Sequence, residues 1–330
     1  MTSILTNVAA MSALQTLRSI NSSMEATQGR VSSGLRVGEA SHNAAYWSIA
    51  TTMRSDNMAL SAVQDALGLG ASKVDTAYAG MESAIEVVKE IKAKLVTATE
   101  EGVDKAKVQE EITQLQQQLL SIASAASFYG ENWLVGVSTL GAPTAGTDPD
   151  MTVVSGFVRD ASGVSVKTAK YALDNTATGN TLFGVIDAAG APDTTGILGT
   201  TSNLTHSDGT TIAAQSVFTL NIMDSDNDAT ADDAFDADQM ADALTMVEDA
   251  LKAMTSAAAE LGSISMRIDL QEDFVAKLSD SIESGIGRLV DADMNEESTR
   301  LKALQTQQQL GIQSLSIANS SSENILSLFR

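Results

Sequence analysis

The sequence contains no cysteine, only three prolines among its 330 residues, and 4% aromatic residues. Without cysteine, neither a disulfide framework nor a thiolate metal site is available, so stability must come from packing. Scarce proline combined with 43% hydrophobic residues favours long helices over a compact aromatic core. We therefore expect a mainly α-helical chain, and its length predicts more than one structural unit.

Basic residues are also scarce: 20 Lys and Arg stand against 42 Asp and Glu, which gives a net charge of −22. A polyanion is repelled by nucleic acid and by anionic lipid, so we predict neither as a partner. No apolar run reaches the roughly 18 residues of a membrane span, and residues 1–30 lack a basic start followed by an apolar run. We expect either a cytoplasmic protein or one exported without a cleaved signal.

Residues that commonly support catalysis or bind metals are few. The only histidines, His42 and His206, lack the spacing of a zinc site. Asp224, Asp226 and Asp228 resemble the start of a calcium loop, but Ala229 and Phe235 replace its turn glycine and closing glutamate, which favours a solvated acidic loop. We predict no catalytic residue, metal or cofactor, and hence a protein that is not an enzyme.

Two long segments carry apolar residues every seven positions, the pattern of helices that pair along a seam. The two series are Met53, Leu60, Leu67, Val74, Met81, Val88 and Leu95, and Val247, Met254, Leu261, Ile268, Val275, Ile282 and Leu289. A shorter seam runs from Val108 to Ile122. We expect a helix over about 45–100 to pair antiparallel with the downstream one, with caps at Asp104, Asp236 and Asp238. Gly68, Gly70 and Gly80 disfavour this helix unless close packing requires them.

Residues 140–233 differ from both flanks, with short Val/Thr/Phe runs between Gly, Asp, Asn and Pro. Segments 152–159 and 164–171 predict a hairpin, and 212–222 predicts another strand. Between 140 and 250 there are 17 acidic residues against Arg159, Lys167 and Lys170. We predict a small β-rich domain that faces solvent and is dispensable for assembly.

Both ends of the chain carry apolar stripes at helical spacing among few charges. The stripe residues are Ile4, Val8, Met11, Leu14, Leu17, Leu301, Leu304, Ile312, Leu315, Leu326 and Leu328. Ordering roughly 80 terminal residues costs on the order of 100 kcal/mol of conformational entropy, more than one two-helix seam recovers. We therefore expect neighbouring copies to bury these stripes.

Several short motifs resemble bacterial flagellins. Val31, Ser32, Ser33, Gly34, Leu35 and Arg36 are similar to the family's N-terminal Leu-Ser-Ser-Gly-Leu-Arg signature. Residues 4–7, 128–131, 291–301 (with Asp291 and Asp293) and 324–330 resemble its Ile-x-Thr-Asn start, its Phe-Asn-Gly turn and its C-terminal ends. Ala44 to Ile49 resembles the version found in plant-associated soil bacteria of the rhizobial type.

The resemblance implies a subunit of the extracellular flagellar filament, a long antiparallel coiled coil built from both chain ends around a small β-rich outer domain. It divides the chain into an inner tube domain (1–43 and 290–330), a coiled-coil domain (44–139 and 234–289) and an outer domain (140–233). Implied partners are further copies, alone or mixed with other flagellins, an export chaperone, a filament cap and hook-filament junction proteins; export is by the flagellar type III route. Two alternatives remain: a hook-filament junction protein, and an exported enzyme on a flagellin frame.

The resemblance also implies weak recognition by innate immune receptors. In family members that a vertebrate Toll-like receptor recognises, the first coiled-coil helix resembles Gln-Arg-Val-Arg-Glu-Leu, where this chain has Glu86 and Val87. An interface arginine is a typical hot spot, and valine supplies no donor. A second interpretation is that Val87 only strengthens a local apolar face. His42, Asn43 and Tyr46 likewise depart from the peptide that plant receptor kinases recognise.

Overall fold

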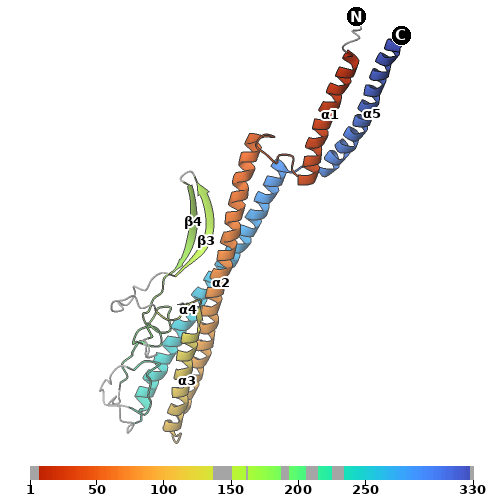
Figure 1. Ribbon diagram of the computed structural model, residues 1–330. Coiled ribbons are helices and arrows are strands. Elements are labelled where there is room, and N and C mark those ends of the chain that lie inside the picture. Colours follow the sequence, from red (N-terminus) through yellow and green to blue (C-terminus); the bar gives the residue numbers. More distant parts are fainter. Residues whose placement is uncertain are drawn as a thin grey trace. The chain divides into compact units, whose positions relative to one another are not determined.

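The chain folds mainly into helices, with a small sheet region in its middle (Figure 1). The computed structural model describes residues 7–136, 151–160, 163–186, 193–205, 215–224 and 234–327. The helices are α1 (Val8–Ser33), α2 (Ala44–Ala98), α3 (Lys105–Ala125), α4 (Ala237–Val290) and α5 (Met294–Ser327). The strands are β1 (Ser127–Phe128), β2 (Glu131–Asn132), β3 (Met151–Asp160) and β4 (Gly163–Tyr171). This architecture agrees with the predicted fold class.

Each helix begins at a side chain that accepts backbone N–H groups, which would otherwise lack partners. Asn7 and Asp104 cap α1 and α3, as Asp104 was predicted to do. Asn43 Oδ1 accepts from Ala45 N and Tyr46 N, both at 3.1 Å. Asp236 Oδ1 accepts from Gln239 N at 2.8 Å while Gln239 Oε1 accepts from Asp236 N at 2.9 Å, a reciprocal capping box ahead of α4. Asp238 instead lies in the first turn.

The chain forms two compact units, one of residues 1–59 with 277–330 and one of residues 60–276. In the second unit α2 and α4 run antiparallel: Asp75 Oδ1 accepts from Ser265 Oγ at 3.2 Å, and Lys92 pairs with Glu248. Moving 17 residues up α2, from 75 to 92, corresponds to moving 17 residues down α4, from 265 to 248, so the register is constant. The Lys92 hydrogen bond lowers the pKa of Glu248 below its ordinary value.

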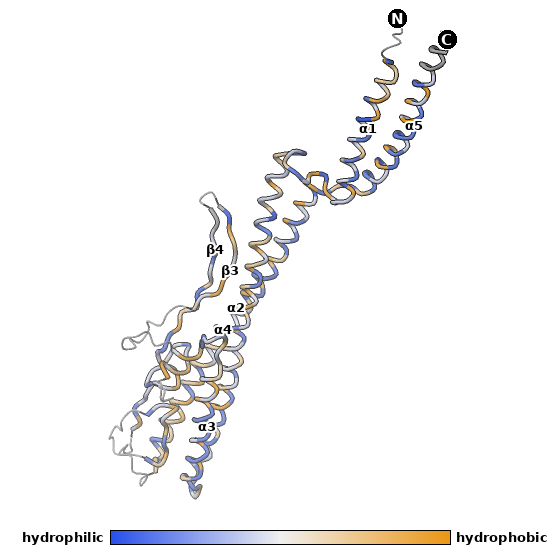
Figure 2. Tube along the Cα trace, viewed as in Figure 1, coloured by the Kyte–Doolittle hydropathy of each residue, from blue (hydrophilic) through white to orange (hydrophobic). Residues whose placement is uncertain are grey.

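Apolar and polar residues alternate along α2 and α4 (Figure 2). The apolar residues of the two seven-residue series are mostly buried. Fully or nearly fully buried are Leu60, Leu67, Val74, Met81, Val88, Leu95, Val247, Met254, Leu261, Ile268 and Val275. In the first unit Met53, Ile282 and Leu289 are partly buried and pack against a small core of Val37, Ala50, Ile286 and Val290. Both helices therefore present one apolar face to the interior over most of their length. Coiled-coil packing and the predicted domain boundaries at 43, 139, 233 and 289 stay predictions.

Of the three glycines that disfavour helix formation in α2, Gly70 and Gly80 lie where another segment approaches closely. An added Cβ at Gly70 would collide with Val153 of β3, and one at Gly80 would lie 2.7 Å from both Ala126 Cβ and Leu134 Cδ1. At Gly68 no atom lies within 4 Å of such a Cβ. Close packing therefore accounts for Gly70 and Gly80, whereas nothing in the structure explains Gly68.

The predicted hairpin is confirmed: β3 and β4 pair antiparallel, with an irregularity between Val154 and Gly156. The strand predicted at 212–222 is wrong for 215–222, while 212–214 lie outside the described residues. There Ser216 and Thr219 bond each other's backbone N–H groups at 2.9 and 3.2 Å and so hold a turn.

The prediction that the middle segment faces solvent is wrong for many residues of its described parts, 173–186, 193–205 and 215–222. Leu182, Phe183, Leu198 and Leu220 are at most 1% exposed. On α3, Gln116 Nε2 donates to Val217 O and Leu220 O at 3.1 and 3.0 Å. Trp133 stacks on Tyr171, with ring centroids 5.5 Å apart. Despite its acidic composition, this segment forms part of the core of the second unit.

A comparison of two glycine substitutions tests the close approach at α2. Gly80→Ala should lower the free energy of unfolding by up to about 2 kcal/mol, because overpacking costs about 1–3 kcal/mol and the helix-propensity gain of about 1 kcal/mol offsets only part of it. Gly68→Ala, where the methyl meets open space, should raise it by about 0.5–1 kcal/mol. Urea denaturation measures both. Equal stabilisation by the two alanines would contradict the packing at Gly80.

Candidate functional site

The signature motifs at the two ends of the chain meet at one backbone crossover in the first unit. Gly34 ends α1 with φ of 73°, a left-handed conformation that suits glycine. The next residue, Leu35, forms a β-bridge with Asp291. Ala292 N donates to Gly34 O at 2.9 Å, and Arg36 N donates to Val290 O at 2.7 Å. Main-chain bonds therefore join segments that lie more than 250 residues apart in the sequence.

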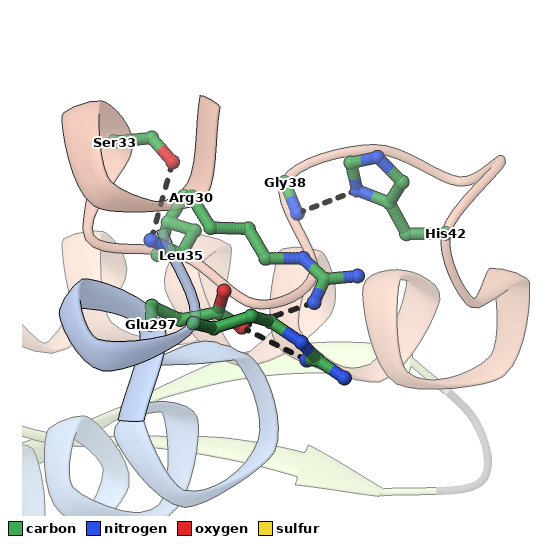
Figure 3. Close-up of polar contacts among 7 residues, drawn as sticks. Arg30, Ser33, Leu35, Gly38, His42 and Glu297 are labelled. Atoms are coloured by element: carbon green, nitrogen blue, oxygen red, sulfur yellow. Dashed lines mark hydrogen bonds and ion pairs between the residues drawn. The ribbon is translucent and has the colours of Figure 1, made fainter. Parts of the chain in front are cut away.

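An ion pair beside the crossover joins α1 to α5 (Figure 3). Arg30 Nη1 lies 3.0 Å from Glu297 Oε1, and the Glu297 side chain is only 7% exposed. Arg300 approaches the same oxygen at 3.8 Å but is 54% exposed. Glu297 Oε2 is buried and has no hydrogen-bond partner within the described residues. The carboxylate therefore depends mainly on Arg30 for compensation of its charge.

The other signature side chains order the backbone on both sides of the crossover. Ser33 Oγ accepts from Leu35 N at 3.2 Å, and Ser32 is exposed on the last turn of α1. Arg36 donates from Nη2 to Leu289 O at 3.0 Å. Asp293 Oδ1 accepts from Asn295 N at 2.8 Å and caps α5. The motif residues thus form helix ends and the connection between them. Their arrangement orients the helices and does not form a reactive site.

Beyond the crossover, α1 and α5 lie antiparallel to each other (Figure 1). Asn7 Nδ2 donates to Ala318 O at 2.9 Å, and Gln308 Nε2 donates to Asn21 Oδ1 at 2.8 Å. The less exposed residues of each helix recur every three or four positions, which defines a seam between them. The seam residues are Ala10, Ala13, Leu17, Ile20, Met24, Thr27 and Val31 on α1, and Leu301, Leu304, Gln308, Gly311, Leu315 and Ala318 on α5.

The predicted assembly residues divide between this seam and the opposite, outer faces of the two helices. Leu17, Leu301, Leu304 and Leu315 belong to the seam. Outside it lie Val8, Met11, Leu14 and Ile312, whose exposed fractions are 72, 63, 40 and 54%. Ile4, Leu326 and Leu328 lie outside the residues whose side chains the structure describes. A single copy therefore buries only part of its terminal apolar surface.

Two further outer-face residues escaped the sequence analysis. Leu310 is 63% exposed and Ile317 is 69% exposed, although each neighbours a seam residue. They are seven residues apart, about two helical turns, and so share one face. Their position outside the 3-4 spacing of the α5 seam is the signal that could have identified them. Ile312 is two residues, or about 200° around the helix, from Leu310 and so lies on another side of α5. We use "outer faces" below for Val8, Met11 and Leu14 on α1 and for Leu310 and Ile317 on α5.

The positions predicted for receptor escape differ in accessibility. Val87 is 5% exposed and forms part of the core of the second unit, which favours the interpretation that it strengthens an apolar face. Its neighbour Glu86 is exposed and pairs with Lys89 at 2.7 Å. His42 and Tyr46 are exposed, whereas Asn43 is half-buried at its capping position.

The described residues contain no group of three metal-ligating side chains, and none of the described helices is long and apolar enough to cross a membrane. Asp224, the only described member of the predicted acidic loop, is 6% exposed rather than solvated. Asp226 and Asp228 lie outside the described residues, as does His206.

Two arginine substitutions test the buried ion pair. Arg30→Met should destabilise the α1–α5 pairing by about 1–3 kcal/mol, because it leaves the Glu297 carboxylate buried without its main partner. Hydrogen exchange of α5 amides should then accelerate roughly 5- to 150-fold. Arg300→Met removes a mostly exposed partner of the same carboxylate and should change exchange little. Equal effects of the two variants would contradict the assigned role of Arg30.

Comparisons with known proteins match both flanks of the chain. Residues 4–139 match the family described as bacterial flagellin N-terminal helical region, and residues 244–329 match the bacterial flagellin C-terminal helical region. Both matched ranges contain signature residues of the crossover. The segment between the two matches contains the hairpin and the irregular part of the second unit.

Curated relatives cover the whole chain. Flagellin A of Rhizobium meliloti (strain 1021) is 55% identical, flagellin C of the same strain is 54% identical, and a flagellin of Brucella melitensis biotype 1 is 44% identical, each over 100% of both chains. A crystal structure of Bacillus cereus flagellin aligns with a TM-score of 0.37 and 18% identity over 65% of this chain and 88% of that one. The family matches and the full-length identities lead to one conclusion: this chain belongs to the bacterial flagellins, and its nearest likeness among these relatives is to the rhizobial ones.

Proposed function

We propose that the chain is the structural subunit of an extracellular flagellar filament and that the outer faces of α1 and α5 form its main contacts with neighbouring copies. The observation that supports this most directly is that five apolar side chains of the outer faces are 40–72% exposed on two helices that are already paired with each other. Exposed apolar side chains grouped on one side of a helix are typical of surfaces at which proteins associate. Because the chain belongs to the flagellins, we infer that the partner at these surfaces is another copy of the same chain.

The distribution of charge favours self-association at these helices. Among residues 1–24 the only charged side chain is Arg18, and residues 303–322 contain none. The net charge of −22 therefore lies elsewhere, so the outer faces can approach one another without strong repulsion. Desolvation of Leu, Ile, Met and Val side chains supplies the driving force, about 25 cal/mol per Å² of apolar area buried.

Two alternatives share the same frame: a hook-filament junction protein and an exported enzyme. The full-length likeness to several proteins named flagellin favours the filament subunit over both. The irregular middle segment shares its core with α3 and so supports the helices, which favours a structural role for it. As further partners we propose an export chaperone, a filament cap and the hook-filament junction proteins.

Replacing outer-face residues should block polymerisation and leave the subunit folded. The double variant Leu310→Gln with Ile317→Gln removes two apolar side chains worth about 1.5–3 kcal/mol each when fully buried. The concentration of free subunit that remains after seeded polymerisation should therefore rise at least about 100-fold. Sedimentation of the filaments followed by measurement of the soluble protein gives this value.

Gln305→Ala provides the control, because this exposed polar residue lies on the same helix but about 140° around it from Leu310. It should polymerise as the wild type does. Normal polymerisation of the double variant would show that the outer face of α5 is not a subunit contact. Failure of wild-type protein to form long filaments would instead refute the filament function itself.

We also propose that innate immune receptors recognise this subunit weakly. Because Val87 is buried, an arginine there would place a charge in the core, so the testable position is the exposed Glu86. Wild-type monomer should give a weak signal in a reporter-cell assay for the Toll-like receptor, and Glu86→Gln should increase it severalfold. Strong signalling by the wild type would refute weak recognition, and an unchanged signal in the variant would exclude Glu86 as its cause.

A further inference from the structure

The turn between β1 and β2 places an aromatic side chain in an unfavourable backbone conformation. Tyr129 has φ of 52° and Gly130 has φ of 83°, so both residues of this two-residue turn are left-handed. Such turns normally begin with Asn, Asp or Gly, because a side chain with a bulky Cβ substituent is strained there. Among the described residues Tyr129 is the only one other than glycine with a positive φ.

The ring of Tyr129 gains nothing within the subunit that offsets this strain, because 93% of the residue is exposed. The turn that carries the ring, in contrast, is held in place by side-chain contacts. Glu131 pairs with Lys73 of α2 at 2.7 Å, and Asn132 Nδ2 donates to Ala123 O at 2.6 Å. Asn132 Oδ1 also accepts from Leu134 N at 2.9 Å. The aromatic ring is therefore presented to its surroundings from a fixed base.

A second unpartnered apolar feature of the same unit lies on α4. Met266, Leu270 and Phe274, which we call the α4 strip, are 66, 65 and 58% exposed. They follow one another at four-residue intervals and so form a continuous line along one side of the helix. Leu270 is nine residues, or two and a half turns, beyond the fully buried Leu261. The strip therefore points away from the core of the unit.

Tyr129 and the α4 strip lie on opposite sides of the second unit. The β1–β2 turn is attached to α2 through Lys73, and α4 contacts α2 through Asp75. Two residues correspond to about 200° around a helix, so the turn and α4 flank α2 on opposite sides. Both features also lie at a similar level along α2, because Asp75 is opposite Ser265, the residue before the strip.

We propose that in the filament the ring of Tyr129 of one copy packs on the α4 strip of a neighbouring copy, side by side. This contact rests on the proposed filament function and adds a second interface to that of α1 and α5. A heterologous contact, in which two different surfaces of one chain meet, is the type that generates an open polymer. A second copy suits this strip because the exposed ring and the exposed strip lie at one level on opposite sides of the unit, so copies placed side by side bring them together.

Substitution of Tyr129 separates this role from a merely local one. Tyr129→Asn suits the left-handed turn and should raise the thermal stability of the monomer while it raises the free subunit concentration after polymerisation about tenfold or more. Tyr129→Phe keeps the ring and the strain and should behave as the wild type in both measurements. An asparagine variant that polymerises as well as the wild type would overturn the contact.

Crosslinking tests the partner surface directly, because the chain has no cysteine and only introduced thiols can react. Filaments of the double variant Tyr129→Cys with Leu270→Cys, assembled on wild-type seeds and oxidised, should give a ladder of covalent oligomers on a denaturing gel. Either single variant, and the double variant as a monomer, should give none.

The outcomes distinguish this contact from the filament function on which it rests. Filaments of the double variant that yield no ladder would overturn the contact and leave the filament function standing. A covalent dimer from the Tyr129→Cys variant alone would also overturn it, since two copies of the turn would then meet each other. Absence of filaments from wild-type protein would overturn both proposals.

Discussion

The structure depends on main-chain pairing between the two ends of the chain. The bridge from Leu35 to Asp291 and the bonds from Arg36 and Ala292 join the end of α1 to the connection between α4 and α5. Substitution of Gly34 would disturb these bonds, because glycine adopts a φ of 73° without the strain that a side chain brings. Glu297 adds a buried charge that is satisfied from α1. Because the crossover places the start of α5 beside the end of α1, it sets up the pairing of these two helices.

The long helices could be predicted because a seven-residue apolar repeat has no strand interpretation. Leu67 and Val74, or Leu261 and Ile268, recur on one side only if the backbone is helical. Their antiparallel pairing followed from the length of the segments and from the need to bury both faces. Helix starts were predictable at Asp104 and Asp236, where a side-chain acceptor precedes the apolar series. The hairpin followed from two β-branched runs around a short polar turn.

Other features could not be derived from the pattern. The acidic composition of the middle segment predicts solvent exposure, but composition does not reveal that Leu182 and Phe183 form a core. Buried glutamines such as Gln116, which bind this segment, give no periodic signal in the sequence. In the terminal helices the apolar residues of the sequence belong to two different faces, and their spacing alone does not separate the two. Leu315 lies in the seam, whereas Ile312 lies outside it. Val87 illustrates the same difficulty, since alignment by motif says nothing about burial. Tertiary packing decides these cases.

The crossover also has a consequence for the timing of folding. Arg30 and Glu297 are separated by 267 positions, and all partners of α1 described here come from the last part of the chain. At a synthesis rate of roughly 5–20 residues per second, α1 waits on the order of 10–50 s after its own completion before its partner helix exists. During that interval its apolar seam and outer face are both unpaired. A nascent chain of this architecture therefore cannot finish its first unit until translation is almost complete, which keeps the N-terminal segment open to other binding partners for most of synthesis.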